Sequence, residues 1–323
     1  MKITDFVYGD FEINEPVLIE LINSKPIQRL KNISQYGVPA EYCPLRGFSR
    51  YDHSVGVMLL LRKLKAPIKE QIAGLLHDVS HTAFSHVVDW VFNHKNEENF
   101  HDTIYEKMIE QSDIPIILNK YAFNANDVIN LEKYLLLERE IPYLCADRVD
   151  YSLKEIYLCS SITDAKFCLS NLTAYNNKIA FTSKNAAYIF GKEFIKCQMT
   201  HWGGAEHSLR FYLLAKILKI GLSNNIINMN DLYQDDVYVM NKLKLANNDE
   251  INSILNLLSG DLKFITDETN PEIDIKKKFR YVDPEYLDNG KLYKLSETDE
   301  NYRILIGENR KINEKGIKIR LVN

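Results

Sequence analysis

The stretch Gly74–His86, GLLHDVSHTAFSH, decides how this chain is interpreted, because an imidazole and a carboxylate stand side by side at His77-Asp78 after an apolar helical run. These two side chains can offer a neutral nitrogen and an oxygen to one divalent cation, a mixed donor set that suits transition metals as well as Mn²⁺ and Mg²⁺. Two ligands are too few for a metal site. The candidates that would complete it are His53 in SRYDHSVGV and Asp147 in CADRVDY.

Histidines gather after this pair more densely than core packing requires. A His-Asp pair alone is more often a hydrogen-bonded part of a core than a metal site. Five of the eight histidines, however, fall in the span that begins at His77 and ends at His101. Imidazole and carboxylate groups that are wholly or partly buried are costly unless they are paired or bind metal. We therefore predict one metal site formed by His53, His77, Asp78 and Asp147.

The composition is that of an enzyme-sized chain. With 323 residues and 46% hydrophobic content, it can bury a large core. The formal net charge of −4 gives no overall basic field, so polynucleotide binding is not indicated. No stretch approaches the ~20 consecutive apolar residues of a membrane helix. The five cysteines are odd in number and show no CxxC spacing, which favours reduced thiols in a cytoplasmic protein.

Hydrophobic spacing predicts a mainly α-helical fold. Apolar residues recur every three or four positions over most of the chain, while alternation with period two is clear only near Ile179 and after Lys278. We expect a helical core over residues 1–222 that carries the site and includes a small hairpin at 177–183. A smaller α+β extension, residues 223–323, is expected to pack on that core, because no glycine- or proline-rich linker separates the two parts.

Individual elements follow from the same spacing and from proline, glycine and asparagine stop signals. Helices are predicted at 16–22, 26–37, 53–64, 68–81, 84–92, 128–138, 141–158, 186–199 and 206–221. A polar loop is expected from residue 94, leading into a helix that ends near residue 111. In the extension, helices at 235–245 and 248–260 precede predicted strands at 276–284, 290–296, 302–307 and 317–323.

Four segments, in their order and separations, resemble the HD-domain phosphohydrolases. They are PIQRLKNISQYG, SRYDHSVGVM, LLHDVSHTAFSHVVD and ADRVDYSLKE. Within that superfamily the similarity is closest to the deoxynucleoside triphosphate triphosphohydrolase branch, which includes the sterile-alpha-motif and HD-domain protein and the bacterial dGTP triphosphohydrolases. The similarity runs from about residue 7 to residue 221, and KKKFRYVDP weakly resembles the family's C-terminal extension.

The resemblance implies a metal-dependent hydrolase. One divalent ion, whether Mn, Mg, Fe, Ni, Co or Zn, would be held by the four ligands already named. The implied substrate is a deoxynucleoside triphosphate, cleaved at the α-phosphate to deoxynucleoside and triphosphate, and the implied assembly is a homo-oligomer. A nucleotidase or phosphodiesterase acting on another small nucleotide is an alternative. A nucleotide-binding protein without catalysis is a second alternative, which the intact set of metal ligands disfavours.

The same resemblance assigns histidines to the path of the phosphates. His81, His86 and His101 occupy positions where the family keeps histidines, and Asp89 would support one of them. A histidine near neutral pH can protonate the leaving oxygen, and a carboxylate partner keeps the ring oriented for that task. His101 and His86 are therefore the predicted proton donors.

Substrate-binding positions are also implied. Arg50 matches a phosphate-binding arginine, and Arg148 replaces a family lysine beside the fourth metal ligand while keeping positive charge near the phosphates. Gln35 and Tyr151 match residues that contact the sugar. Tyr36 stands where the family commonly has a compact aliphatic residue, so its ring could exclude a 2′-hydroxyl or its phenol could hydrogen-bond that hydroxyl.

Other positions depart from the family. The run HDVSHTAFSH lacks the glycines and the proline that usually follow the metal pair, so this loop is expected to differ in shape. Asn23 and Lys31 stand where an aspartate and an arginine bind an activating nucleotide in allosteric members, so the resemblance leaves open whether this chain has an activator site. Trp202 and His207 lie in HWGGAEHSLRFY, a segment without a residue-by-residue match, and receive no role.

Overall fold

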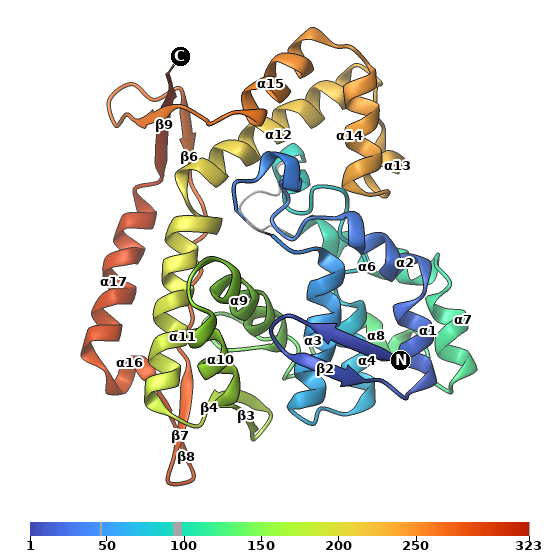
Figure 1. Ribbon diagram of the computed structural model, residues 1–323, viewed down its shortest axis with the longest axis vertical. Coiled ribbons are helices and arrows are strands. Elements are labelled where there is room, and N and C mark those ends of the chain that lie inside the picture. The colour runs from blue at the N-terminus through green and yellow to red at the C-terminus, as the bar shows by residue number, and fades with distance from the viewer. Residues whose placement is uncertain (46, 93–98, 323) are drawn as a thin grey trace.

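The computed structural model describes residues 1–45, 47–92 and 99–322, and its body is mainly helical (Figure 1). The helices that form this body are α1 (Pro16–Ile22), α2 (Lys25–Arg29), α3 (Arg50–Lys63), α4 (Ile68–Leu76), α5 (Val87–Val91), α6 (Phe100–Glu110), α7 (Ile114–Lys120), α8 (Asn126–Ile129), α9 (Ala146–Cys159), α10 (Ile162–Ser170), α11 (Lys184–Cys197), α12 (Ala205–Ser223), α13 (Met229–Leu232), α14 (Asp236–Leu245), α15 (Asp249–Ser259), α16 (Leu295–Thr298) and α17 (Glu300–Glu314). Shorter turns are the 3₁₀ segments η1 (Leu30–Asn32) and η2 (Ala40–Tyr42) and the π-helical turn η3 (Gln198–Trp202). The mainly α-helical fold expected from apolar spacing is confirmed.

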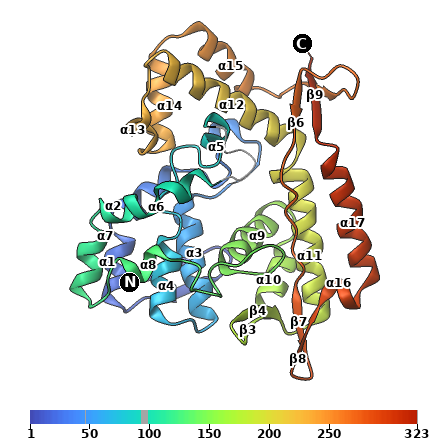
Figure 2. The ribbon, with the colours of Figure 1, turned by 180° about the vertical axis from the view of Figure 1, so that it is seen from behind.

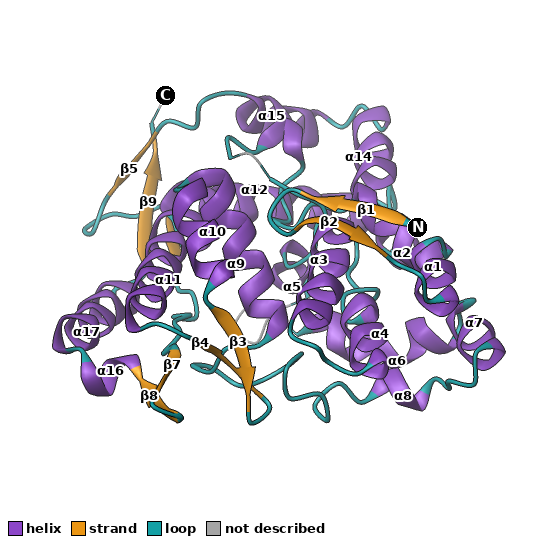
Figure 3. Cartoon of the chain, turned by 60° about the horizontal axis from the view of Figure 1, so that its bottom comes forward, coloured by secondary structure: helices purple, strands orange, loops and turns teal. Residues whose placement is uncertain are grey.

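Within the described residues, the strands form three small sheets that lie apart from one another around the helices (Figure 3). They are β1 (Lys2–Asp5) with β2 (Gly9–Glu12); β3 (Leu172–Tyr175), β4 (Lys178–Phe181), β7 (Glu285–Asp288) and β8 (Lys291–Lys294) in that order; and β5 (Phe264–Thr266), β9 (Ile317–Leu321) and β6 (Ile273–Ile275) in that order. All pairings are antiparallel except β4 with β7. The segment 276–284, which joins β6 to β7, connects two distant sheets along the length of the molecule (Figure 2).

The start of α3 is fixed by its own sequence. Ser49 forms a capping box with Asp52: the Asp52 amide donates to Ser49 Oγ over 3.1 Å, and the Ser49 amide donates to the Asp52 carboxylate over 2.9 Å. Such a reciprocal cap defines the first turn of a helix. Arg50 and His53 lie in this turn, and α3 packs against α4 and α9. The cap therefore places two predicted site residues in the helical core.

Helix α4 ends at Leu76, earlier than the predicted helix at 68–81. The chain leaves the helix here because a side chain of α14 binds the backbone of the following loop. The Phe84 amide donates to Asp236 Oδ1 over 2.7 Å, and Phe84 has a positive φ of 62°. The His-Asp pair therefore lies where the helix ends and the loop begins, and a residue more than a hundred positions later shapes that loop.

The predicted helix at 128–138 is wrong beyond Ile129, where α8 ends. Glu70 of α4 supplies the reason. Its Oε1 accepts hydrogen bonds from the amides of Leu136 and Leu137 over 2.9 and 3.2 Å. A side chain that binds backbone donors in this way competes with helical hydrogen bonding. The segment consequently forms turns along the wall of a cavity.

Two other predicted helices are shorter in the structure than in the sequence prediction. The helix predicted at 26–37 stops as α2 at Arg29 and continues only as the 3₁₀ turn η1. The helix predicted at 141–158 begins at Ala146, because the carbonyl oxygen of Tyr143 is bound by the Arg148 side chain over 2.6 Å. Both differences leave irregular backbone next to the predicted site.

The predicted strand at 302–307 is wrong, because these residues lie inside α17. Asp299 caps that helix by accepting a hydrogen bond from the Tyr302 amide over 3.1 Å. Tyr302 is fully buried, and its hydroxyl occupies the space that a Cβ on Gly191 would need, 2.4 Å away. The segment predicted as a strand at 276–284 pairs with no other strand among the described residues. The strands predicted at 290–296 and 317–323 correspond to β8 and β9, and the hairpin near 177–183 is formed by β3 and β4.

The buried core consists of two clusters that both combine residues from either side of residue 223. Leu153 and Phe194 belong to the first with Tyr302, and Phe84 belongs to the second with Leu243. The extension thus packs on the helical core, while a domain division at 222/223 stays a prediction. The loop predicted from residue 94 lies outside the described residues as far as residue 98. None of the described helices combines the length and apolar character needed to cross a bilayer.

Candidate metal centre and its cavity

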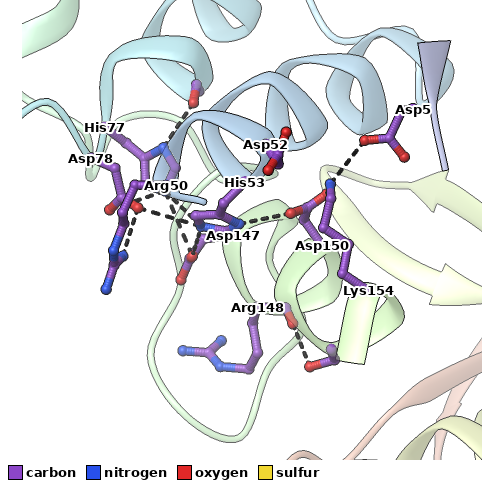
Figure 4. A network of polar contacts seen from close by, with 12 residues as sticks. Asp5, Arg50, Asp52, His53, His77, Asp78, Asp147, Arg148, Asp150 and Lys154 are labelled. Atoms are coloured by element: carbon purple, nitrogen blue, oxygen red, sulfur yellow. Dashed lines mark hydrogen bonds and ion pairs between the residues drawn. The ribbon is translucent and has the colours of Figure 1, made fainter. Parts of the chain in front are cut away.

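Three predicted ligands converge from three elements (Figure 4). His53 lies in the first turn of α3, His77 directly follows α4, and Asp147 lies in the first turn of α9. His53 Nε2 is 2.9 Å from Asp147 Oδ1, His77 Nε2 is 3.6 Å from the same oxygen, and the two Nε2 atoms are 3.2 Å apart. One donor atom from each residue lies within 4.8 Å of the others. This spacing is suited to a shared cation.

The hydrogen bonds at the back of both rings support that interpretation. His53 Nδ1 lies 2.7 Å from Asp150 Oδ2, and His77 Nδ1 lies 2.8 Å from the carbonyl oxygen of Gly74. Both partners can only accept, so each Nδ1 carries a hydrogen and donates it. The two Nε2 atoms then face each other and Asp147 with lone pairs available, which is the orientation that metal-binding histidines require. The donor set therefore fits a divalent ion.

Electrostatics at the centre also favour a cation. Burial lowers the pKa of His77, but the carboxylates of Asp78 and Asp147 outweigh that effect and raise the pKa to about 10. For Asp147, burial raises the pKa, while the neighbouring His53 and His77 hold it well below its usual range. The carboxylates that favour a proton on an imidazole would equally favour a metal ion in its place.

The fourth predicted ligand, Asp78, lies beside the group formed by His53, His77 and Asp147 and does not belong to it. Its oxygens are 3.7 Å from His53 Nε2 and 3.5 Å from His77 Nε2. One oxygen is held by Arg50 Nη1 at 2.7 Å, and the other is 3.3 Å from His81 Nε2. Burial alone would raise the pKa of Asp78, but Arg50 and the neighbouring histidines keep it well below its usual range. As a metal ligand, Asp78 stays a prediction.

A buried ion network continues behind His53 and was not assigned a role from the sequence (Figure 4). Asp150, which accepts from His53, also accepts from Lys154 Nζ over 2.6 Å, and Lys154 lies 3.2 Å from Asp5 of the N-terminal hairpin. All three charged groups are buried. A Cβ on Gly56 would lie 1.9 Å from Lys154 Nζ, so only glycine leaves room for this arrangement. The network connects the N-terminal strand to a predicted metal ligand.

We expect Asp150→Asn to weaken metal binding by about tenfold to a hundredfold, the usual effect of changing a group that orients a metal-binding histidine. Asparagine has one acceptor oxygen, and its NH2 group can only donate. It therefore cannot accept hydrogen bonds from both His53 and Lys154, and the imidazole of His53 loses its fixed orientation. Chelator-competition titration would measure the affinity. Asp127→Asn, which alters a surface ion pair with Lys69, serves as the control. Equal affinities in the parent and Asp150→Asn would contradict the orienting role.

The centre opens into a cavity of about 750 Å³, within the size range of small-molecule sites. Predicted site residues that line it are Gln35, Tyr36, Arg50, His77, Asp78, His81, His86, His101, Asp147 and Tyr151. Three other predicted site residues do not line the cavity. His53 is fully buried beneath the centre, Asp89 lies behind His86, and Arg148 is turned elsewhere.

The predicted phosphate-path histidines form one cluster in the cavity wall. The rings of His81 and His101 stack at 4.0 Å, and His86 meets both edge-on. Burial and nearby cations lower the pKa of His101 to about 3 and that of His81 well below its usual range, so both rings are neutral at neutral pH. His86 has a carboxylate partner, because its Nδ1 lies 2.9 Å from Asp89 Oδ2. The geometry thus favours His86 over His101 as the proton donor.

Arg148 does not occupy the place predicted beside the phosphates. Its Nη1 donates to the carbonyl oxygens of Arg139 and Tyr143 over 3.2 and 2.6 Å, which turns it away from the centre (Figure 4). The cations that line the cavity are instead Arg50, Arg139, Lys277, Lys278 and Arg280. The last three come from segment 276–284, and the basic run KKKFR was the sequence signal that could have identified them.

The π-helical turn η3 provides residues that the sequence prediction left without a role. Trp202 lines the cavity and packs edge-on against Tyr151 at 5.2 Å. Gln198 is only 2% exposed, and its Oε1 has no partner among the described residues. Glu155, four positions after Tyr151 on α9, accepts hydrogen bonds from the Tyr36 hydroxyl and from His201. Buried polar atoms without partners in a cavity are typical of groups that bind a ligand.

Comparisons with known proteins agree with this geometry. The sequence model of the HD domain matches residues 50–160, which include the three converging ligands. The uncharacterized protein YdhJ of Bacillus subtilis is 37% identical over all of this chain and 99% of its own length. The metal-dependent phosphohydrolase Cns2 of Cordyceps militaris is 36% identical over 54% of this chain and 50% of its own length. A deoxynucleoside triphosphate triphosphohydrolase SAMHD1 homologue of Dictyostelium discoideum is 25% identical over 54% of this chain and 42% of its own length. A solved structure of a hypothetical protein from Aquifex aeolicus superimposes with a TM-score of 0.70 at 20% identity, covering 96% of this chain and 99% of its own.

Proposed function

Since the chain belongs to the HD-domain phosphohydrolase superfamily and brings together two imidazoles and a carboxylate that could hold a metal ion, we propose that it hydrolyses deoxynucleoside triphosphates at the α-phosphate, releasing deoxynucleoside and triphosphate. The observation that carries this proposal is one cavity lined by His77 and Asp147, by Arg50 and the histidine cluster, and by Gln35 and Tyr151. A site that binds phosphate and sugar in one cavity is suited to a nucleotide.

A divalent ion held by His53, His77 and Asp147, with Asp78 beside them, would polarise a phosphoryl oxygen and offset its developing charge. Arg50 points into the same space. Two of its N–H groups bind Asp78 and Ser85, at 2.7 and 3.1 Å, and the remaining donors of the planar guanidinium are suited to phosphate oxygens. Arg50 would thus hold the reacting phosphate next to the metal group.

Proton donation to the leaving oxygen is assigned to His86. Asp89 accepts from His86 Nδ1 and also from the Phe100 amide over 2.9 Å, so the carboxylate is itself held in place. A carboxylate behind an imidazole keeps the ring oriented and stabilises its charged form. His101 would act as a neutral hydrogen-bonding group in the phosphate path. His81 would separate the metal group from the other two rings.

The sugar end is formed by Tyr36, whose ring is 5% exposed and packs edge-on against Phe48 and His207. Because its hydroxyl is bound to Glu155, the ring is held in one position. This favours exclusion of a 2′-hydroxyl by crowding over binding of that hydroxyl by the phenol. Gln35, whose Oε1 has no partner among the described residues, is left to bind the sugar.

We expect Tyr36→Leu to reduce the preference for dGTP over GTP, measured as the ratio of kcat/KM values, by up to about a hundredfold, the usual limit of discrimination by crowding. Tyr36→Phe is the matched variant, because it keeps the ring and removes only the bond to Glu155. It should preserve most of the preference. An unchanged ratio in Tyr36→Leu would remove this residue from the sugar pocket, and equal values for the two nucleotides in the parent would contradict the deoxynucleotide preference.

One observation favours a second candidate function, hydrolysis of a nucleotide with fewer phosphate charges by a nucleotidase or phosphodiesterase reaction. The cavity wall at 131–140 presents Glu132 and Glu140, whose carboxylates oppose the binding of a polyanion. A cavity lined in part by acids tolerates a monophosphate better than a triphosphate.

Product analysis separates the two candidates. The protein would be incubated with a panel of deoxynucleoside triphosphates and with nucleoside monophosphates, with Mn²⁺, Mg²⁺, Fe²⁺, Co²⁺ or Ni²⁺, and the products separated by anion-exchange chromatography. We expect inorganic triphosphate and deoxynucleoside. Orthophosphate or pyrophosphate as the first product would support the second candidate, and no turnover under any condition would support a non-catalytic nucleotide-binding role. The homo-oligomer and the cytoplasmic location expected from the sequence stay predictions.

A further inference from the structure

The loop that follows the His-Asp pair, residues 79–86, is held in place by the extension. Two consecutive amides of this loop donate hydrogen bonds to it. The Ala83 amide donates to the carbonyl oxygen of Leu232 over 2.9 Å, and the Phe84 amide donates to Asp236 Oδ1 over 2.7 Å. Leu232 ends α13, and Asp236 begins α14. The extension therefore fixes the backbone of a loop whose histidines line the metal cavity.

The other carboxylate oxygen of Asp236 holds a second segment of the cavity wall. Its Oδ2 accepts a hydrogen bond from the Ser34 amide over 2.9 Å, and Ser34 directly precedes the predicted sugar-binding residues. Asp236 is 4% exposed, and a carboxylate buried to this extent is costly without donors to bind it. The two segments also pack closely, since a Cβ on Gly37 would lie 2.7 Å from the carbonyl oxygen of Phe84. Asp236 thus bridges two walls of the cavity from behind.

The backbone of the loop has a conformation that needs such support. Phe84 and Ser85 both have positive φ angles, of 62° and 46°. Two consecutive residues other than glycine in this region are strained, and they keep this conformation only where the surrounding structure holds them. Asp236 binds the amide of the first of the two. Strained residues that are held in this way cluster at functional sites.

Ser85 connects this held backbone to Arg50. Its Oγ accepts a hydrogen bond from Arg50 Nε over 3.1 Å and donates one to the carbonyl oxygen of Ser34 over 2.9 Å. Arg50 Nη1 binds Asp78 at 2.7 Å on its other side (Figure 4). The guanidinium is therefore oriented by one carboxylate and one hydroxyl. The position of that hydroxyl depends on the two segments that Asp236 bridges.

We propose that Asp236 is a positioning residue for phosphate hydrolysis: its carboxylate fixes the loop at 79–86 so that Ser85 directs Arg50 toward the reacting phosphate. Asp236 does not line the metal cavity, so it acts only through the residues it holds. The effect on the rate rests on the proposed function, whereas the hold on the loop does not. The two parts are tested separately, so that failure of one can be distinguished from failure of the other.

The hold on the loop is tested by hydrogen–deuterium exchange of the intact protein at about pH 8. Burial raises the pKa of Asp236 to about 7, against the effect of the two bound amides, so the carboxylate is mostly ionised there. Asp236→Asn keeps the size of the side chain but has one acceptor oxygen, so one amide loses its partner. We expect exchange in peptides that cover 79–86 to become about tenfold faster, because a hydrogen bond to a charged group is lost. Unchanged exchange would overturn the hold on the loop.

Asp235→Asn is the matched control, because it removes the same charge from the neighbouring position. Asp235 caps α14 by accepting a hydrogen bond from the Tyr238 amide over 2.9 Å, and asparagine caps helices about equally well. Its other oxygen accepts from the exposed side chain of Asn32 over 3.0 Å. We expect this variant to match the parent in both loop exchange and kcat. A loop that exchanges equally fast in both variants would show that loss of charge, and not loss of the acceptor oxygen, is responsible, and would overturn the proposal.

The effect on catalysis is measured as kcat and KM on the substrate that the parent hydrolyses fastest. We expect Asp236→Asn to lower kcat by up to about a hundredfold, the cost of a displacement of about 1 Å in a positioned group. KM should stay within about threefold, because the Gln35 amide remains bound to the carbonyl oxygen of Phe48 at 3.0 Å and keeps the sugar end in place. An unchanged kcat would overturn the positioning role.

Combination with Arg50→Lys separates this role from a general structural one. If Asp236 acts through Arg50, adding Asp236→Asn to Arg50→Lys should lower kcat by less than about threefold, because the group being positioned has already lost its planar fork. Effects that simply multiply would overturn the pathway through Arg50. Ser85→Ala decides the case if Asp236→Asn does not fold, and should lower kcat about tenfold by removing the connecting hydroxyl. If the parent hydrolyses no phosphate ester, the proposed function and the effect on the rate both fail, while the exchange result still decides the hold on the loop.

Discussion

Replacing Asp147 by alanine is expected to abolish both metal binding and hydrolysis while leaving the protein folded. Asp147 Oδ1 is the atom that both imidazoles approach, at 2.9 and 3.6 Å, so its removal takes away the only carboxylate oxygen of the converging group in the described structure. Loss of a catalytic metal ion removes several kcal/mol of transition-state stabilisation, and each 1.4 kcal/mol is tenfold in rate. The expected loss in kcat/KM is therefore roughly ten-thousandfold or more.

The measurement combines metal content with thermal unfolding. A ligand present at about a thousand times its dissociation constant stabilises the folded state by about 4 kcal/mol. The parent should therefore gain Tm on addition of Mn²⁺, and Asp147→Ala should not. Asp164→Ala is the matched control, because Asp164 also lies in the first turn of a helix, α10, and its removal changes the helix terminus in the same way. Full metal content and turnover in Asp147→Ala would show that the centre lies elsewhere.

Local sequence was sufficient to predict those helices and strands whose ends are determined by their own residues. The helix at 16–22 was predicted with its observed bounds because Pro16 begins it and its buried residues recur at helical spacing. The helix at 128–138 failed because the backbone of Leu136 and Leu137 is bound by Glu70, about seventy positions earlier. No window of local sequence contains that contact.

The strand predicted at 302–307 failed for a related reason. Apolar and polar residues alternate there roughly as they would in a strand. However, Asp299 caps a helix at this point, and Tyr302 is buried in the space above Gly191. Isolated alternation in a short segment cannot exclude a helix, because Tyr302 and Ile306 also lie four positions apart and are buried on one face.

Motifs at the ends of elements were the best guide to which candidate residues meet in space, and the roles of these residues stay predictions. His77 was identified from its pairing with Asp78, and His53 and Asp147 were chosen from SRYDHSVGV and CADRVDY to complete the set. The structure brings one donor atom of each of the three within 4.8 Å of the others. Arg148 was misplaced because its orientation depends on two carbonyl oxygens in an irregular loop. Gln198 was missed because a π-helical turn, which has no sequence signal in the chain, is what turns it into the cavity.

Replacing Arg50 should separate catalysis from metal binding. Arg50 is 3% exposed, and its Nη1 holds the Asp78 carboxylate at 2.7 Å. Arg50→Lys keeps a positive charge but loses the planar fork that can bind Asp78, Ser85 and a phosphate at once. We expect kcat/KM to fall by about a thousandfold, at the upper end of the effect of removing one preorganised donor. Metal content should be retained, because Arg50 is not a donor to the cation.

For Arg50→Lys, the direction of the change in metal affinity is a more specific test than the loss of kcat/KM. In the parent, Arg50 holds Asp78, whose oxygens lie 3.5 to 3.7 Å from the imidazole nitrogens, and would compete with a bound metal ion for this carboxylate. Weakening that ion pair frees a carboxylate next to the centre, so Arg50→Lys should bind Mn²⁺ at least as tightly as the parent. Arg62→Lys, at the other end of α3 in a half-exposed pair with Glu15, is the matched control and should change neither property. If Arg50→Lys loses metal in proportion to activity, Arg50 acts by building the centre, and its assignment to the substrate phosphate is wrong.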